Sequence, residues 1–232
     1  MKYVPSIAFD EMSGSAKGVT AAKVRGRKYI RNRGYGGSTR STLQASVKSV
    51  FKELSQAWKN LTQEQIVSWN TLAQTQAGKS VLGTSARITG SNLFMRLNYW
   101  VVYCGGEIMV NPPTLQGVEA PAEAIVNLTP TKFTFELEKE PALPGNLKLI
   151  VQASAPQSNG ISNAYSKASQ IGTPLEPAIE EYDLKEVYDA KYGIPTTASP
   201  KVFIKYFFVN TATGEKSGDM MALATLAEDA GE

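Results

Sequence analysis

The sequence predicts an α+β chain in three parts: an N-terminal extended basic arm, a small three-helix module and an antiparallel β-sandwich. Three observations lead to this prediction. Charge is segregated along the chain, apolar residues recur at helical spacing in its middle, and they alternate at strand spacing after residue 112. A chain of 232 residues is long enough for two ordinary domains. The expected bounds are 1–40 for the arm, 41–111 for the helices and 112–232 for the sandwich.

The two halves of the chain carry opposite net charges. Residues 1–111 hold 15 Lys and Arg against 5 Asp and Glu, a net of +10. Residues 112–232 hold 9 Lys, no Arg and 16 Asp and Glu, a net of −7, so that the whole chain is +3. Residues 12–52 contain 10 basic residues and no acidic one. A stretch of this kind favours a polyanion or an acidic protein surface as its partner.

The first 37 residues are predicted to be extended. Six glycines interrupt residues 14–37, and no apolar periodicity is sustained there. Lys28–Arg33 alternates in the manner of one short strand. We expect this strand to pair with a partner outside the arm.

Three helices are predicted for the middle of the chain. The first covers 41–61, where apolar residues recur every three or four positions. The second begins at Thr62, which forms a capping box with Gln65, and is expected to end at Gly78. The third covers 91–103, with Trp100 on its inner face. All three tryptophans of the chain fall in these helices and are interpreted as core residues.

The pattern changes to period two beyond Asn111–Pro113, which we interpret as a linker. Residues 180–192 fit either a strand pair or a short helix. Short strands punctuated by Pro and Gly indicate an antiparallel sandwich of about 100 residues, similar in size to immunoglobulin or fibronectin domains. The strands are expected at 131–137, 147–153, 201–209 and 219–226, with a hairpin turn at 213–218.

Several kinds of chemistry are excluded by composition. The chain has no histidine and one cysteine, so Ser-His-Asp catalysis, Cys-His catalysis and an intrachain disulfide are impossible. A structural zinc site lacks ligands. Cys104 lies in an apolar run and is interpreted as a small buried hydrophobe. Ser13–Gly18 lacks the spacing of a phosphate-binding Walker loop. We expect no catalytic residues, no metal and no cofactor, and predict that the protein is not an enzyme.

Membrane insertion and export by a secretory signal are not expected. The apolar runs are far shorter than the ~20 residues of a membrane span, and the first residues lack the apolar core of a signal peptide.

The basic arm is the remaining functional signal, because its cations are interleaved with tyrosines and glycines. Flexible cations suit phosphate groups, and tyrosine rings stack on bases. The same composition suits an arm laid over an acidic protein surface, or a solvated tail, and all three interpretations stay open. The candidate partner-binding residues are Lys17, Lys23, Arg25, Arg27, Lys28, Tyr29, Arg31, Arg33, Tyr35 and Arg40.

Six segments within residues 13–103 form a distinctive combination, although each alone is weak. They are Ser15–Gly18, Tyr29–Arg33, Ala57–Trp58, Leu61–Gln65, Ser68–Ala73 and Thr89–Asn98. In this combination residues 13–103 resemble a family of uncharacterised proteins encoded among the virion genes of tailed bacteriophages, including crAss-like phages. The β region matches only in general style, since immunoglobulin-like domains are common appendages of phage capsid and tail proteins.

The resemblance implies a structural component of the virion, assembled in the bacterial cytoplasm in multiple copies. We expect an auxiliary capsid protein whose partners are other virion proteins, above all the major capsid protein, with packaged DNA as a further contact. A neck or tail component is the first alternative. A nucleic-acid-binding protein that uses the basic arm is the second.

Overall fold

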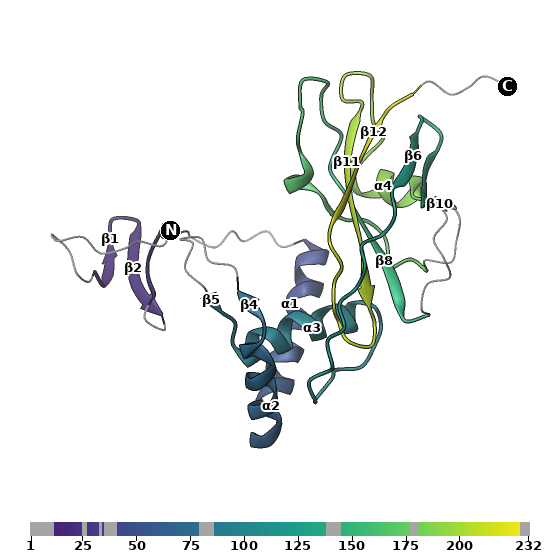
Figure 1. Ribbon diagram of the computed structural model, residues 1–232. Helices are drawn as coiled ribbons and strands as arrows, with labels where there is room; N and C mark the ends of the chain where they lie inside the picture. Colours follow the sequence, from purple (N-terminus) through teal and green to yellow (C-terminus); the bar gives the residue numbers. More distant parts are fainter. Residues whose placement is uncertain are drawn as a thin grey trace.

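The protein is a mixed α+β chain with antiparallel sheets, and four α-helices lie in the part of the chain that the structure describes. Figure 1 shows this arrangement in a computed structural model: helices α1–α3 form one group, and the strands β6–β12 with helix α4 form another beside it. The described residues are 12–24, 27–32, 34, 41–78, 86–137, 145–176 and 181–227.

The three N-terminal helices begin at side-chain caps that are readable in the sequence. Helix α1 (Thr42–Lys59) starts at Ser41, whose hydroxyl accepts a hydrogen bond from the amide of Gln44. Helix α2 (Gln63–Gln74) starts at Thr62 with the predicted capping box to Gln65. Helix α3 (Gly90–Tyr103) starts at Thr89.

The expected end of α2 at Gly78 is wrong. The helix stops at Gln74, and β4 (Ala77–Gly78) then pairs with β5 (Ala86–Arg87). Strand pairing uses the backbone of Gly78, so this glycine belongs to a ladder rather than to a helix C-cap.

Helix α3 is the centre of the helical group, because both other helices pack against it. Phe94 is fully buried and contacts the rings of Trp58 and Trp69, each with centroids 5.3 Å apart. The indole of Trp69 also donates a hydrogen bond to the carbonyl of Val110, at 2.9 Å. Trp69 is therefore a buried core residue, as predicted, and Trp58 is partly buried and packs against the same core. The buried members of this cluster are Leu54, Leu61, Trp69, Ala73, Leu93, Phe94 and Leu97.

Asn98 holds the segment that follows α3 against this helix. Its side chain is 0 % exposed, and its amide oxygen accepts a 2.6 Å hydrogen bond from the backbone amide of Met109. Its amide nitrogen donates to the carbonyls of Phe94 and Met109. Asn98 thus joins the segment after α3 to the helix through a buried polar side chain, in addition to the bond from Trp69 to Val110.

The C-terminal strands form two antiparallel sheets. The first has the order β10-β7-β6 and is built from the strands Glu181–Asp183, Phe133–Leu137 and Ala124–Leu128. The second has the order β12-β11-β8-β9 and is built from the strands Met220–Thr225, Lys201–Asn210, Leu147–Ala153 and Ser169–Gln170. A parallel bridge between Leu128 and Leu226 connects the two sheets at one edge.

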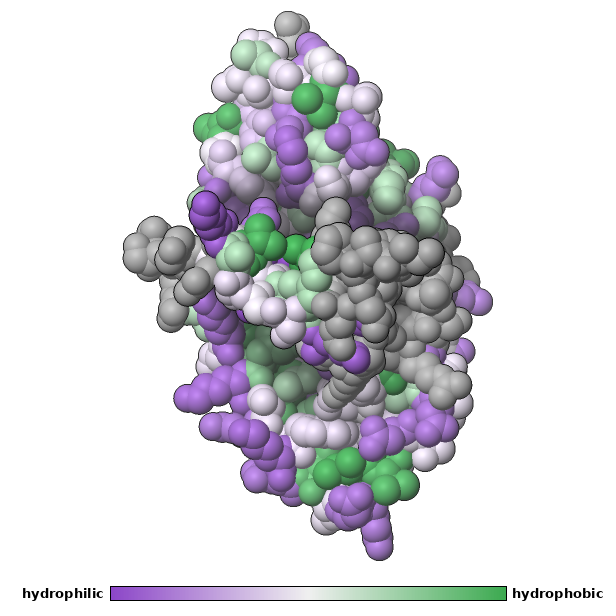
Figure 2. Space-filling view, turned by 90° about the vertical axis from the view of Figure 1, so that its left-hand side faces the viewer, coloured by the Kyte–Doolittle hydropathy of each residue, from purple (hydrophilic) through white to green (hydrophobic). Residues whose placement is uncertain are grey.

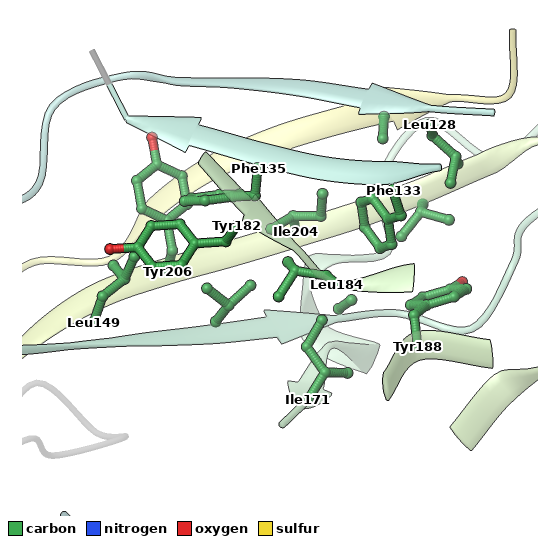
Figure 3. Close-up of a cluster of buried hydrophobic side chains, with 14 of the residues drawn as sticks. Leu128, Phe133, Phe135, Leu149, Ile171, Tyr182, Leu184, Tyr188, Ile204 and Tyr206 are labelled. Atoms are coloured by element: carbon green, nitrogen blue, oxygen red, sulfur yellow. The ribbon is translucent and has the colours of Figure 1, made fainter. Parts of the chain in front are cut away.

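The inner faces of both sheets share one hydrophobic core, which Figure 3 shows in close-up. Phe135 of one sheet contacts the ring of Tyr206 of the other, with centroids 5.0 Å apart. Phe133 meets Tyr188 edge to face, and the Tyr188 hydroxyl donates to the carbonyl of Ser154. The core follows from the period-two pattern, because alternate residues of a strand point to the same face.

The ambiguous segment 180–192 contains both a strand and a helix. Strand β10 pairs with β7, and α4 (Lys185–Tyr192) follows after Leu184. Strand β8 matches its predicted bounds, whereas β6 and β9 were not predicted. A short 3-10 helix, Tyr165–Lys167, lets the ring of Tyr165 cover Phe203 on the outer face of β11.

The helical group and the sheets meet directly at α3. Trp100 packs edge to face on Phe207 of β11, with ring centroids 5.3 Å apart. The hydroxyl of Tyr103 donates to the carbonyl of Gly172. Trp100 therefore faces the sheet rather than the core of the helices, which corrects its expected position. It is an apolar residue of the junction, together with Tyr103, Cys104, Ile150, Phe207 and Val209.

The turn after β11 approaches the backbone of α3 so closely at Gly214 that this position has no room for a side chain. A Cβ atom on Gly214 would fall 2.1 Å from the carbonyl oxygen of Leu97, and Gly214 has a φ of +70°. The neighbouring carboxylate of Glu215 accepts hydrogen bonds from the amides of Gln116 and Gly117. Segments far apart in sequence are therefore fastened together at this point.

The described part of the predicted arm contains three strands in the order β1-β2-β3: Gly14–Ala16, Val19–Val24 and Arg27–Asn32. The strand over residues 28–33 was expected to pair outside the arm, and this is wrong: β3 pairs with β2 along its length. Val24 pairs with Arg27, so the two strands are neighbours both in the sequence and in the sheet. In Figure 1 this sheet stands to one side of the helices.

Candidate functional site

The structure places five side chains of the ten predicted partner-binding residues, all in the β1–β3 sheet: Lys17, Lys23, Lys28, Tyr29 and Arg31. Only the backbone of Arg27 is described, at the start of β3. Arg25, Arg33, Tyr35 and Arg40 lie outside the described residues. The candidate site is therefore built from the sheet and not from the whole arm.

Lys17 stands at the tip of the first hairpin. Ala16 pairs with Val19, so that Lys17 and Gly18 form a two-residue turn. Both have positive φ, 34° and 87°, which is the geometry of a turn that matches the twist of the flanking strands. The exposed lysine is thus presented at one end of the sheet.

One face of the sheet carries a pair of lysines side by side. Lys23 lies directly opposite Lys28 in the register of β2 and β3. Like charges in directly opposed positions repel one another and destabilise a strand pair. The register therefore concentrates two positive charges on this face of the sheet.

The other face carries a row of hydroxyl groups that ends in a guanidinium. Ser15 pairs with Thr20, and Thr20 pairs with Arg31, so the three side chains lie side by side across three strands. The hydroxyls of Ser15 and Thr20 are 2.8 Å apart. This row borders a hollow of about 600 Å³, lined by Ser15, Thr20, Arg31, Asn32 and Gly34. Side chains of this kind donate hydrogen bonds to anions.

The sheet has no buried residue among its described side chains. The three hydrophobic clusters of the described chain contain no residue from 12 to 34. A three-stranded sheet needs a packed apolar face for independent stability. In Figure 2, which faces this side of the molecule, apolar residues form small separate patches on the visible surface. A partner that covers the sheet would therefore stabilise it.

The opposite charge is gathered on the first C-terminal sheet. Glu181 of β10 lies directly opposite Glu136 of β7, and both are exposed. Asp183 follows on the same strand and is also exposed. The segregation seen in the sequence is thus retained in space, with lysines on one sheet and carboxylates on another.

Asp219 belongs to a separate charged cluster on the second sheet. Its carboxylate lies 2.5 Å from the ammonium of Lys216 and 3.4 Å from that of Lys205. Burial would raise the pKa of Asp219, but hydrogen bonds and charges from these lysines outweigh it and hold the pKa below its usual value. Lys216 also lies over the ring of Phe207, 3.8 Å from its centroid. Two lysines share one carboxylate here, so the cluster keeps a net charge of +1 and has the character of a structural ion-pair network.

Cys104 packs as a small apolar residue at the junction, although it is half-buried rather than buried. Burial raises the pKa of its thiol from 9.0 to about 11, and the charge of Lys148 offsets only part of this rise. The thiolate is the nucleophilic form of cysteine. At neutral pH this sulfur is therefore a poor nucleophile.

We expect native Cys104 to react with iodoacetamide at pH 8 about 100-fold more slowly than a free thiol, because a pKa higher by two units lowers the thiolate fraction by that factor. The rate should rise to the ordinary value in denaturing urea. Cys104 is the single cysteine, so mass spectrometry of the alkylated chain reports on it alone. Equal rates in buffer and in urea would contradict the packing of the thiol.

Two further findings concern metals and membranes. Within the described ranges, no group of three or more His, Cys, Asp or Glu side chains is placed to hold a metal ion. None of the helices in that part of the chain is both long and apolar enough to cross a membrane.

Sequence reasoning missed Ser15 and Thr20 as members of the site. Both are small hydroxyl residues with no distinctive spacing, and only the register of three strands brings them beside Arg31. The signal that was available is the Lys17–Gly18 turn, which predicts a hairpin and would have paired Ser15 with Thr20. No family model matches the chain, and a comparison with curated proteins finds no match.

Proposed function

We propose that the chain is a structural component of a bacteriophage virion, an auxiliary capsid protein that binds and reinforces the head shell through its basic arm. The proposal starts from the resemblance of residues 13–103 to virion proteins of tailed phages. Its partners would be other virion proteins, above all the major capsid protein, and its location would be the assembled particle.

The observation that carries the proposal is the segregation of charge in space. The basic β1–β3 sheet carries a pair of lysines on one face and the exposed Arg31 on the other, whereas the first C-terminal sheet carries the exposed carboxylates of Glu136 and Glu181. A protein with one basic and one acidic end binds an acidic surface in a single orientation. Repetition over a symmetric shell then multiplies many weak contacts.

The order of the C-terminal strands supports an immunoglobulin-like sandwich as the second part of the proposal. An immunoglobulin-like domain has strands A, B and E in one sheet and C, F and G in the other. The sheet β10-β7-β6 corresponds to E-B-A, and β12-β11-β8 corresponds to G-F-C, with β9 as an added edge strand. Such a domain would project from the shell or bridge to a neighbouring protein.

The test is quantitative mass spectrometry of purified particles of the phage that encodes the chain. An auxiliary shell protein should be present in on the order of hundreds of copies per particle, as repetition in a closed symmetric shell requires. About a dozen copies would assign the chain to a ring in the neck or tail instead. Its complete absence from the particle would refute the virion role.

The reinforcing role has its own test. Particles that lack this protein should lose their DNA at a lower temperature than complete particles, because each bound copy stabilises the shell by mass action. Equal heat resistance of the two kinds of particle would show that the bound protein does not stabilise the shell and would contradict the reinforcing role.

A further inference from the structure

The hollow on the β1–β3 sheet has the features of an anion-binding site. The described part of its lining contains one guanidinium and two hydroxyls, and none of these described lining residues is acidic. The whole stretch from residue 12 to residue 52 contains no Asp or Glu. No ion pair of Arg31 with a carboxylate occurs among the described residues. Among the described residues, the guanidinium of Arg31 is therefore not neutralised by a carboxylate and is available to an anionic ligand.

The hydroxyls of Ser15 and Thr20 leave one hydrogen available for a ligand, whichever of the two donates to the other. Ser15 and Thr20 are 2.8 Å apart, and either oxygen can be the donor to the other. One hydroxyl hydrogen is used between them, so the second hydrogen is left to point to an oxygen atom in the hollow. The guanidinium of Arg31, which is exposed, adds a planar fork of N–H groups beside it.

An aromatic ring lies next to this row on the same face. Tyr29 is two residues from Arg31 on β3, and its partner Ala22 is two residues from Thr20 on β2. Residues two apart on a strand share a face and are about 6.6 Å apart. Tyr29 is half-buried, so part of its side chain is accessible to a ligand. Cations in line with an aromatic ring are the recurring features of surfaces that follow a nucleic-acid strand.

We infer that the hollow lined by Ser15, Thr20 and Arg31 binds a phosphodiester group of a nucleic acid. The guanidinium fork and the hydroxyl hydrogen each meet a phosphate oxygen, and Tyr29 lies where the adjoining sugar or base passes. The site deepens the proposed function and rests on it for the identity of the nucleic acid, which would be the DNA packaged under the shell. Lys17, exposed at the tip of the β1–β2 hairpin, adds sequence-independent attraction near the site.

The test measures binding of the full chain to fluorescently labelled oligothymidylate, and to a duplex of the same length, by anisotropy at increasing salt. Arg31→Gln should weaken binding about tenfold and lower the slope of log affinity against log salt by about 1, because one phosphate contact is lost. Thr20→Val keeps the shape and strand propensity of threonine. It should weaken binding about three- to tenfold with an unchanged slope, because it removes a neutral donor.

Matched controls separate the site from charge and composition. Arg96→Gln removes an exposed arginine from α3, and Thr134→Val removes a hydroxyl from β7; both should bind like the wild-type protein. Wild-type affinity in both Arg31→Gln and Thr20→Val would overturn the inference, because the sheet would then attract DNA by diffuse charge alone. Poly-glutamate that binds more tightly than either oligonucleotide would overturn it in favour of an acidic protein surface.

The two DNA probes distinguish the source of the phosphodiester. Tighter binding of the single strand indicates that a base stacks on Tyr29, whereas equal binding of both indicates contact with the backbone alone. Copy number in the particle does not depend on Thr20 or Arg31. Hundreds of copies per particle together with no DNA binding would therefore refute the phosphate site and leave the virion role standing. DNA binding that depends on Arg31 and Thr20, together with absence from the particle, would refute the virion role and leave the phosphate site standing.

Discussion

A Gly214→Ala variant is expected to unfold about 5–15 °C below the wild-type protein, which corresponds to a loss of about 2–5 kcal/mol. Two causes add together. Gly214 has a φ of +70°, where a side chain costs about 1–2 kcal/mol. The new Cβ would also lie 2.1 Å from the carbonyl oxygen of Leu97 and 2.6 Å from its carbon, both backbone atoms of α3. The turn must therefore move away from the helix.

Gly105→Ala is the control that separates the two causes. Gly105 has a φ of +84° but no atom within 4 Å of a built Cβ, so it incurs only the conformational cost of about 1–2 kcal/mol. Thermal unfolding of both variants, followed by circular dichroism, gives the difference. If Gly214→Ala were no less stable than Gly105→Ala, the close approach of the turn to α3 would be wrong.

An Asn98→Leu variant is expected to have a free energy of unfolding about 2–4 kcal/mol lower than the wild-type protein. Leucine has a branched shape similar to that of asparagine, so the loss comes from the hydrogen bonds. Asn98 is 0 % exposed and makes hydrogen bonds to both the amide and the carbonyl of Met109. Leucine leaves these two backbone groups without that partner, and an unsatisfied buried polar group costs about 1–3 kcal/mol. Urea unfolding monitored by tryptophan fluorescence measures the loss, because Trp69 lies in the same cluster.

Asn92→Leu is the matched control for Asn98→Leu. Asn92 is exposed on the first turn of the same helix, so its replacement should change stability by less than about 0.5 kcal/mol. An equal urea midpoint for Asn98→Leu and Asn92→Leu would show that the segment after α3 is held by other contacts. The Trp69 indole, which donates to Val110, would then be the residue to change next.

Elements marked by local chemistry were predictable from sequence. Thr62 was recognised as a helix cap because a capping box depends only on a residue three positions away. The helix that begins after Ser41 was predicted from the spacing of its apolar residues. Strand β8 was predicted with its observed bounds from its period-two segment and the turn residues that precede it. Gly78 misled the same reasoning, because glycine ends helices and also joins strands, and only its pairing with Ala86 distinguishes the two.

The position of Trp100 depended on long-range contacts. Its helical spacing places it on an apolar face of α3, but α3 has two such faces, one toward α1 and α2 and one toward β11. Spacing along a helix gives the angle of a side chain about the axis and not the identity of its neighbour. Phe207, more than a hundred residues later, is that neighbour.

The sequence by itself determined the α+β class, the basic and acidic halves, the three N-terminal helices and the main strands, since each follows from composition or from spacing within about ten residues. Only the tertiary structure decided how the helices join the sheets and which side chains stand beside Arg31. Both depend on register and on contacts between distant segments, which no local pattern encodes. Thr20 acquires its place in the site solely because β2 pairs with β1 on one side and with β3 on the other.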